Sequence, residues 1–426
     1  MTASPPTAAS GDPSETLPAA YPEIPAARTC PFQPPALYAQ LRSEQGPLAQ
    51  ASLYDGRTVK VVVGHAQART LLTDPRVSSD WADPDFPSPS PRRRGIIAKV
   101  NMLIGQDAPE HTRYRKLLVP TFTLRRIAEL RPAVQRTADR LLDDILARGP
   151  QGGVDLFADY ALPVSSTTIC TILGVPYADH EFFERQTARL VAREATEQDA
   201  LKALIGLRQY LAGLVETKRK EPGDGLIDAL LAQTDAPDAD APDADGPALT
   251  GDDVTTLSIL LLMAGHETTA SMIALGTYTL LSHPDQLAAL RADPALLPSG
   301  IEELLRYLSI ADIALRIAKD DIEIDGTAIK RGDGILLPNA GINRDPEAFP
   351  DPDVFDVARG ARQHTAFGYG IHQCLGQNLA RMEMEIALGT LFARIPTLRV
   401  AVPDAELDVK PAHAGVQGIY ALPVTW

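Results

Sequence analysis

The sequence predicts a mainly α-helical protein with a minor β portion. Apolar residues recur at three- and four-residue steps over most of the chain, which is the spacing of an amphipathic helix. Segments of β type are short and few, and no run alternates strand with helix. Because a doubly wound nucleotide-binding fold is built from alternating βαβ units, this pattern argues against that fold. A chain of 426 residues has ample material for one large core.

Two stretches of the chain look unstructured. Residues 1–28 are rich in Pro, Ala, Ser and Thr, with neither a basic head nor an apolar run, so we expect a disordered tail and no signal peptide. Residues 29–426 are predicted to form a single domain. Within it, residues 235–250 contain an acidic near-repeat with regularly spaced prolines, which predicts a flexible, solvated loop.

The first half of the domain begins with a hairpin and continues as helices. Residues 48–64 contain two β-type runs on either side of Asp55-Gly56, a favoured hairpin turn. Apolar periodicity then predicts surface helices over 125–148 and 200–218.

The second half is organised around one long helix. Residues 251–282 fit a single helix of about thirty residues and about 45 Å, which would cross the whole protein. Thr250 stands before it as an N-cap and Pro284 closes it. The remaining predicted elements are helices over 284–292, 298–308 and 375–393, and strands near 322–324, 329, 335–337 and 419–424.

Composition excludes several classes of protein. The chain has 40 Lys+Arg against 55 Asp+Glu, a net charge of −15, and such a field repels nucleic acids and anionic membranes. Three scattered cysteines are too few for a disulfide framework or a multi-cysteine zinc site, which is typical of a reducing compartment. No uninterrupted apolar run reaches the roughly 18 residues of a membrane span. We therefore expect a cytoplasmic protein with no membrane anchor and no nucleic-acid partner.

The segment 366–381 carries the strongest chemical signal. Cys374 follows a loop with two glycines and precedes a helix, whose positive end lowers a cysteine pKa and favours the thiolate. Gly368 lets the backbone pass close to something flat and large, and Gly376 removes a side chain from the same face. A metal macrocycle fits this description. Taken alone, the pattern also fits a buried cysteine beside an ordinary Gly-rich turn.

The full spacing F-G-x-G-x-H-x-C-x-G resembles the haem-thiolate signature of the cytochrome P-450 monooxygenases. It is carried by Phe367, Gly368, Gly370, His372, Cys374 and Gly376. The resemblance extends from about residue 29 to the C-terminus and is greatest to a soluble actinobacterial subgroup that hydroxylates vitamin D, statin precursors and polyene macrolides. It implies the P-450 fold, a triangular prism with the long helix over the haem, and heme b (iron protoporphyrin IX) as cofactor. It makes Cys374 the axial iron ligand, with Phe367 beside the thiolate and His372 near a propionate.

A second motif, AGHETT, lies in the middle of the long helix. Ala264 and Gly265 leave room above a flat cofactor. The hydroxyls of Thr268 and Thr269 can donate to carbonyls of the preceding helical turn, which distorts the backbone hydrogen bonds of the helix and makes a groove for a small molecule. Glu267 beside Thr268 offers an acid and a hydroxyl for proton delivery, the role this pair has in the family. Alternatively, Glu267 pairs with a neighbouring base. A zinc-protease H-E-x-x-H motif is excluded because position 270 is alanine.

Two further groups gain meaning from the resemblance. Glu303 and Arg306 lie on one face of a helix and match the family's structural ion pair, with Arg359 as a candidate third member that helps to hold the cysteine loop. Haem propionates need cationic partners. The matching positions are His111, Arg115, Arg316 and His372, and Leu315 is expected to narrow the pocket beside Arg316.

The function implied is insertion of one oxygen atom from O2 into a bulky lipophilic natural product that is macrolide-, polyketide- or steroid-like. Electrons are expected from a ferredoxin and its ferredoxin reductase, which use NADPH or NADH, and we expect a monomer. The expected ferredoxin-facing cations are Arg113, Lys116, Arg125, Arg126 and Arg381, and the expected substrate-facing segments are 77–104, 182–194, 259–263, 310–315 and 414–416. Open alternatives are epoxidation, dealkylation or oxidative coupling, and a non-catalytic haem-binding sensor or carrier.

Overall fold

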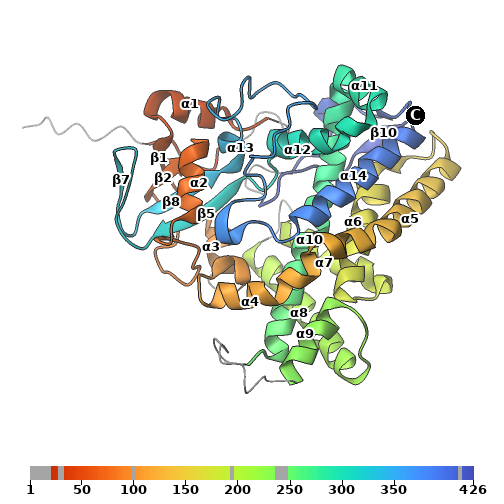
Figure 1. The fold of residues 1–426 in the computed structure, drawn as a ribbon, viewed down its shortest axis with the longest axis horizontal. Coiled ribbons are helices and arrows are strands. Elements are labelled where there is room, and N and C mark those ends of the chain that lie inside the picture. Colours follow the sequence, from red (N-terminus) through yellow and green to blue (C-terminus); the bar gives the residue numbers. More distant parts are fainter. Residues whose placement is uncertain (1–20, 27–32, 98–101, 192–195, 236–247, 411–414) are drawn as a thin grey trace, which may run out of the picture.

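The computed structural model describes residues 21–26, 33–97, 102–191, 196–235, 248–410 and 415–426. Helices form most of it, and the strands of the largest sheet gather with α1 and α2 at one side of the molecule (Figure 1). The predicted mainly helical fold class is therefore confirmed. Most of the predicted tail and of the acidic loop lies outside the described residues. Residues 21–26 are an exception to the predicted tail, because Ile24 is fully buried and pairs with Ser52.

Helix α10 (Gly251–Ser282) runs through the middle of the protein (Figure 1) with the bounds that the sequence predicts. Thr250 accepts a hydrogen bond from the Asp253 N–H at 3.1 Å, and the Asp253 carboxylate accepts one from the Thr250 N–H at 2.8 Å. In the described part of the chain it is the one helix long and apolar enough to cross a membrane, but 67% of that window is buried. It is the core helix of the fold.

Helices α6, α8 and α14 pack against α10 and surround it with most of the apolar core. The other helices are α1 (Ala36–Gln45), α2 (His65–Thr73), α3 (Pro91–Ile97), α4 (Glu110–Leu118), α5 (Leu124–Arg148), α6 (Leu162–Leu173), α7 (His180–Val191), α8 (Glu197–Lys220), α9 (Leu226–Asp235), α11 (Pro284–Ala292), α12 (Leu297–Leu308), α13 (Asn339–Ile342) and α14 (Gln377–Arg394). Short helical turns are η1 (Leu103–Gly105), η2 (Val119–Phe122), η3 (Phe157–Ala161), η4 (Tyr177–Asp179), η5 (Pro294–Leu296), η6 (Gly370–His372) and η7 (Asp404–Glu406).

The largest sheet has the order β1-β2-β8-β5-β3, in which only the β2–β8 pair is parallel. The predicted hairpin forms its edge. The strands are β1 (Leu48–Ser52), β2 (Thr58–Val62), β3 (Val77–Ser78), β4 (Val154–Asp155), β5 (Ile313–Ala318), β6 (Ile322–Ile324), β7 (Thr327–Ile329), β8 (Gly334–Pro338), β9 (Arg399–Val400) and β10 (Pro423–Thr425). The strand predicted over 419–424 is shorter than expected, because Ile419 forms only an isolated bridge with Val409.

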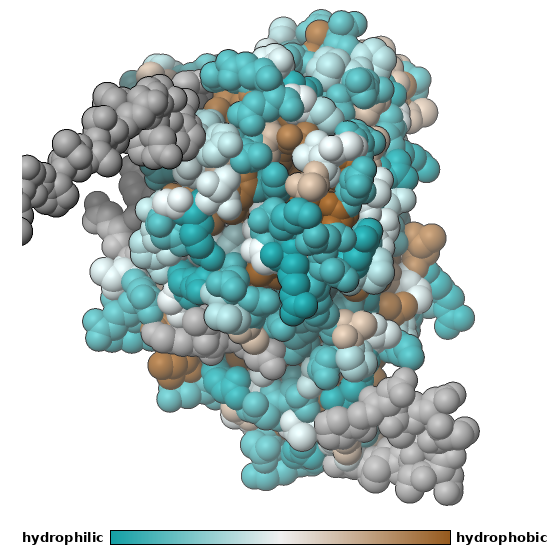
Figure 2. All heavy atoms as spheres, turned by 90° about the vertical axis from the view of Figure 1, so that its left-hand side faces the viewer, coloured by the Kyte–Doolittle hydropathy of each residue, from teal (hydrophilic) through white to brown (hydrophobic). Residues whose placement is uncertain are grey.

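Two smaller apolar clusters lie on the two faces of this sheet, one beneath α1 and one beneath α2. The face of the molecule seen in Figure 2 is mainly hydrophilic, with apolar residues scattered between the polar ones. The sheet therefore forms a second packed layer beside the helical core, and β5 brings Arg316 close to His111 and His372.

Candidate functional site

The cysteine loop is folded tightly before it enters α14. The Cys374 N–H donates to the Phe367 carbonyl at 2.8 Å, and the Gly368 N–H donates to the Thr365 carbonyl at 2.7 Å. Gly370 has a φ of 72°, and a Cβ there would lie 2.2 Å from the Leu72 carbonyl oxygen. Only glycine readily adopts this positive φ and also leaves room for the Leu72 carbonyl. The loop conformation is therefore fixed by the sequence itself.

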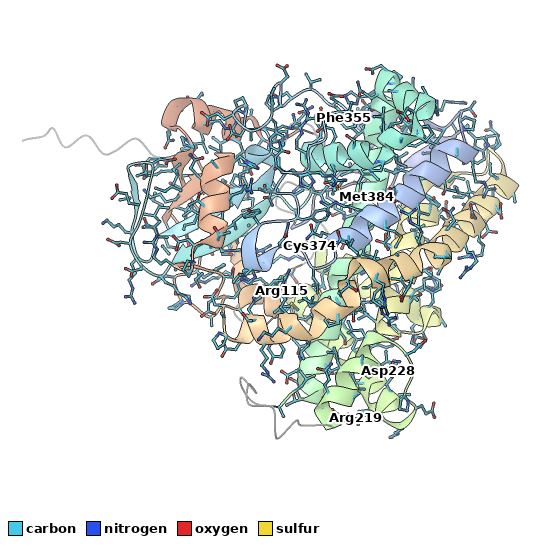
Figure 3. The ribbon with its side chains drawn as sticks, in the orientation of Figure 1. Arg115, Arg219, Asp228, Phe355, Cys374 and Met384 are labelled. Carbon is cyan, nitrogen blue, oxygen red and sulfur yellow. The ribbon has the colours of Figure 1, made fainter. Side chains whose placement is uncertain are left out.

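Cys374 is placed at the start of α14, with Arg115 of α4 nearby (Figure 3). The residue is exposed, yet desolvation by the surrounding protein raises the pKa of its thiol. The N–H of Gly376 and the guanidinium groups of Arg115 and Arg381 oppose this rise without overcoming it. The helix start thus favours the thiolate, as expected, through the Gly376 N–H, but desolvation has the larger effect on the thiol pKa. A Cβ on Gly376 would meet no atom within 4 Å, so this position faces open space as expected.

The middle of α10 is more open than its flanks. Ala264 is exposed, whereas the helix is buried on either side, from Ile259 to Leu262 and from Thr269 to Leu280. Gly265 serves a different purpose from the one predicted. A Cβ there would lie 2.6 Å from Cγ1 of Ile169 on α6, so this glycine allows α6 to approach α10 and does not make room for a cofactor.

Four nitrogen-bearing side chains converge from α4, β5 and η6, as the sequence predicts. The rings of His111 and His372 have centroids 4.1 Å apart, and Nη2 of Arg115 donates to the Gln373 carbonyl at 2.6 Å. Burial, followed by the charges of Arg316, His111 and Arg115, lowers the pKa of His372 to about 3. Burial lowers the pKa of Arg316 to about 10. These shifts show that the groups share one poorly solvated region.

This basic cluster lacks an anionic partner of its own. His111 Nδ1 and His372 Nε2 are buried without a hydrogen bond, and among the described residues neither Arg115 nor Arg316 forms an ion pair. The nearby Asp107 carboxylate is already engaged by Lys319 at 2.5 Å. Because buried donors are normally satisfied, the cluster fits an external dianion. The two propionates of haem have that charge, so the residues present fit this cofactor.

Glu267 and Thr268 lie side by side at the open part of α10. The Thr268 hydroxyl donates to the Ala264 carbonyl at 2.7 Å, which confirms the predicted back-bond. Throughout these residues α10 stays a continuous α-helix, so the predicted distortion is absent there. Oε1 of Glu267 accepts a hydrogen bond from Nζ of Lys410 at 2.6 Å, and these side chains are 13% and 2% exposed. The alternative in which Glu267 pairs with a base is thus observed.

The sequence offers no signal for Lys410 as that base. It lies 143 positions from Glu267 in the chain, so the two residues are not neighbours on one helix. Its Nζ also donates to the Ser271 hydroxyl at 3.3 Å, and the backbone around it is held by a pair of bonds to the strand-like segment near Gly418. Only the folded chain brings the two charges together.

The predicted ion pair of α12 forms and is completely buried. Nε of Arg306 and Oε2 of Glu303 are 2.7 Å apart, and Nε of Arg359 lies 3.1 Å from the other carboxylate oxygen. Arg306 further donates to the carbonyls of Asn343 and Pro352. The pair therefore fastens the long segment that precedes the cysteine loop, and Arg359 is confirmed as its third member.

Sequence reasoning missed a second set of contacts from the same helix. Glu302 accepts hydrogen bonds from Arg381 at 2.6 and 3.0 Å, and Nε2 of His364 lies 3.1 Å from its carboxylate. Burial alone would raise the pKa of Glu302, but these partners lower it to about 2. The Arg381 guanidinium also lies 4.7 Å from the ring centroid of Phe367. Glu302 thus joins α12, the cysteine loop and α14.

This fold and this set of groups define a haem-thiolate oxygenase, and the chain belongs to the cytochrome P450 family. The family model described as Cytochrome P450 matches residues 190–398. Pentalenic acid synthase of Streptomyces avermitilis is 51% identical over 97% of this chain and 98% of its own length. Vitamin D3 dihydroxylase of Streptomyces griseolus is 48% identical over 95% of this chain and 97% of its own.

The solved structures agree with these relatives. The mycinamicin VIII C21 methyl hydroxylase MycCI of Micromonospora griseorubida, bound to mycinamicin VIII, has a TM-score of 0.85 and 38% identity, and the match covers 95% of this chain and all of that one. The chain is accordingly a cytochrome P450 monooxygenase, and its cofactor is haem held by a thiolate.

Proposed function

We propose that this protein hydroxylates a bulky lipophilic natural product of macrolide, polyketide or steroid type. The observation that carries the proposal is the unpartnered basic cluster beside Cys374, because it matches the dianionic cofactor with which such enzymes activate O2. The relatives are named for pentalenic acid, vitamin D3 and mycinamicin, which supports a large lipophilic substrate without selecting one.

In this proposal Cys374 provides the thiolate ligand of the haem iron, and His111, Arg115, Arg316 and His372 bind the propionates. The cofactor supplies the activation of O2. The protein's own part is to hold the cysteine loop through Glu303 and Glu302 and to exclude water with the apolar core around α10. When bound, the haem iron would itself favour the thiolate form of Cys374.

Proton delivery is assigned to Glu267 and Thr268. The Thr268 hydroxyl lies one helical turn after Ala264, whose exposure marks the open part of α10. Glu267 is proposed to take up a proton from solvent-side groups, and the Thr268 hydroxyl to deliver a proton at the open part of α10. Lys410 holds the carboxylate in place at 2.6 Å and is a positioning residue in this scheme.

The substrate is proposed to enter beside the first half of α10. A pocket of about 530 Å³ lies between η1, α4, α8 and the first half of α10. It is lined by Leu103 and Ile259, which belong to two of the predicted substrate-facing segments. Apolar side chains from α8 complete it, among them Leu201, Leu204 and Ile205. Polar and charged side chains share the lining, among them Gln106, Arg208 and Asp252, so the pocket suits a lipophilic molecule that carries polar groups.

Electrons are proposed to come from a ferredoxin and its NADPH- or NADH-dependent reductase in the cytoplasm, with the oxygenase acting as a monomer. Lys116, Arg125 and Arg126 are exposed near the N-terminus of α5, beside an exposed Leu124. Arg381 pairs with Glu302, and Arg125 and Arg126 each pair with Glu129, so only part of their charge is offered to a partner. Cations around an apolar residue suit an acidic partner.

The proposal is tested by turnover under isotopically labelled O2. A natural-product library is first screened for molecules that shift the spin state of the holoenzyme, and each hit is incubated with ferredoxin, reductase and NADPH. We expect a product that has gained one labelled oxygen atom as a hydroxyl group. An epoxide, a dealkylated or a coupled product would overturn the hydroxylase assignment. Tight binding with no product from any hit would favour the sensor or carrier.

A further inference from the structure

Three consecutive arginines begin helix α3 (Pro91–Ile97), within the predicted substrate-facing segment 77–104. Two of them fasten the helix to main-chain carbonyls. Arg92 donates to the Leu190 carbonyl near the end of α7, and Nη1 of Arg94 donates to the Phe86 carbonyl at 2.7 Å. These bonds hold both faces of a helix that is only seven residues long.

Arg93, between them, has no such partner. Its Nε is buried and forms no hydrogen bond, and within the described residues its guanidinium makes neither a hydrogen bond nor an ion pair. Burial lowers the pKa of this guanidinium, and no nearby acid opposes the shift. The residue as a whole is only partly buried, so the terminal nitrogens of this guanidinium are available to an anion.

The position of Gly415 shows which way the side chain of Arg93 extends. A Cβ on Gly415 would lie 3.6 Å from Nη1 of Arg93. Gly415 is in the turn predicted to face substrate, so the guanidinium lies between two substrate-facing segments that are distant in sequence. Its planar fork of donors is suited to the two oxygens of a carboxylate. A single cation also matches the single charge of a carboxylate better than the double charge of a phosphate monoester.

We propose that Arg93 is a specificity-determining residue that binds a carboxylate on the lipophilic substrate. This inference rests on the proposed function and names the substrate class more closely, as an apolar skeleton that carries one carboxyl group. The carboxylate anchors one end of the molecule at α3, and the oxidised carbon lies elsewhere on the skeleton.

The test uses matched acids and methyl esters with the holoenzyme. Dodecanoic, abietic and lithocholic acid supply a linear, a tricyclic and a steroidal skeleton, and each is compared with its own methyl ester by equilibrium dialysis and by the spin-state shift. We expect at least one acid to bind about 10- to 100-fold more tightly than its ester, as a charge-assisted pair allows. Arg93→Ala should abolish this preference while ester affinity changes less than about twofold.

Arg94→Ala is the matched control, since it removes the same charge from the same helix but loses only bonds to main-chain carbonyls. It should leave the acid-to-ester ratio intact, and Arg93→Lys should restore part of it. The proposal is overturned if no acid in the set binds more tightly than its ester, or if Arg93→Ala and Arg94→Ala reduce the ratio equally. Dialysis needs no turnover, so this result is independent of whether the protein hydroxylates anything.

Discussion

The carboxylate of Glu267 and the ammonium group of Lys410 form a charged pair beside the hydroxyl of Thr268. Both side chains are nearly buried, and 2.6 Å separates Oε1 from Nζ. Removing one partner from such a pair leaves a charge with little water around it. Lys410 therefore determines where the Glu267 carboxylate lies, although it touches neither cofactor nor O2 in our proposal.

Lys410→Met is expected to lower the free energy of unfolding by roughly 3 kcal/mol, because it leaves Glu267 uncompensated. Adding Glu267→Gln to this variant should recover a large part of the loss, since no isolated charge then remains. Denaturant unfolding of the wild type, both single variants and the double variant measures the coupling. Strictly additive losses would show that the two groups do not stabilise one another.

Thr268→Ala is expected to divert electrons from substrate oxidation into hydrogen peroxide, because the proton-relaying hydroxyl is lost. The measurement is peroxide formed per NADPH consumed in the reconstituted system. Thr277→Ala is a matched control: its hydroxyl makes the same kind of back-bond, to the Ile273 carbonyl at 2.8 Å, but it is completely buried. Equal peroxide yields from the two variants would contradict the role of Thr268.

At the residue scale the sequence predicts the groups that belong to contiguous motifs. The Cys374 loop, the Thr268 back-bond and the Glu303–Arg306 pair all follow from short spacings. Lys410 and Glu302 could not be predicted, because their partners are defined only after folding. The one hint in the sequence for Glu302 is that it is a second acid, directly before Glu303, on a strongly apolar helix. That hint does not identify its partners.

The contact between α10 and α6 depends on one glycine. Gly265→Ala is expected to destabilise the protein by about 1–3 kcal/mol, because the new Cβ would lie 2.6 Å from Cγ1 of Ile169. Gly213→Ala in α8, where a Cβ would meet nothing within 4 Å, is the control and should stabilise by up to about 1 kcal/mol. Thermal unfolding compares the two. If both variants are stabilised alike, the packing role of Gly265 is wrong.

Helix α14 buries an acid against α10 and α6. Glu383 is 1% exposed, and neither carboxylate oxygen forms a hydrogen bond that meets geometric criteria, although Thr168 and Thr269 lie close by. Burial raises its pKa from 4.5 to about 8. A folded-state pKa above the unfolded value means that stability is fully present below pH 4.5 and is lost as the pH rises towards 8.

Glu383→Gln should therefore gain stability relative to the wild type as the pH rises from 5 to 8, by about 3 kcal/mol at pH 7. The amide keeps the shape of the neutral acid but cannot ionise. Unfolding free energies measured at several pH values test this. A difference that stays constant from pH 5 to pH 8 would contradict the raised pKa.

At the element scale, apolar periodicity predicted most of the long helices, and capping signals fixed the ends of α10. The box of Thr250 and Asp253, together with Pro284, fixed both ends of α10. The sequence gives no clear period for α6, because the polar run from Ser165 to Thr168 lies largely in the core. There, Ser165 and Thr168 satisfy their hydroxyls by bonding back to helix carbonyls. Strand β5 was missed because Arg316 interrupts its apolar residues.

The whole molecule combines a net charge of −15 with a basic site. The excess of acids argues against nucleic acids as partners, but it says nothing of the cluster formed by α4, β5 and η6 or of Arg93. Composition averages over the chain, whereas the fold gathers cations from segments more than 200 residues apart. The fold class, the core helix α10 and the cysteine motif were therefore predictable from the sequence. The position of Arg93 beside Gly415 was not.

The central claim is that Cys374 holds haem iron as a thiolate between α10 and the start of α14. The most direct test is the absorption spectrum of the purified holoenzyme after reduction and exposure to carbon monoxide. We predict the red-shifted Soret band that only thiolate ligation produces, and its loss in Cys374→Ser. A wild-type spectrum without that shift, or a shifted band that persists in Cys374→Ser, would contradict the assignment.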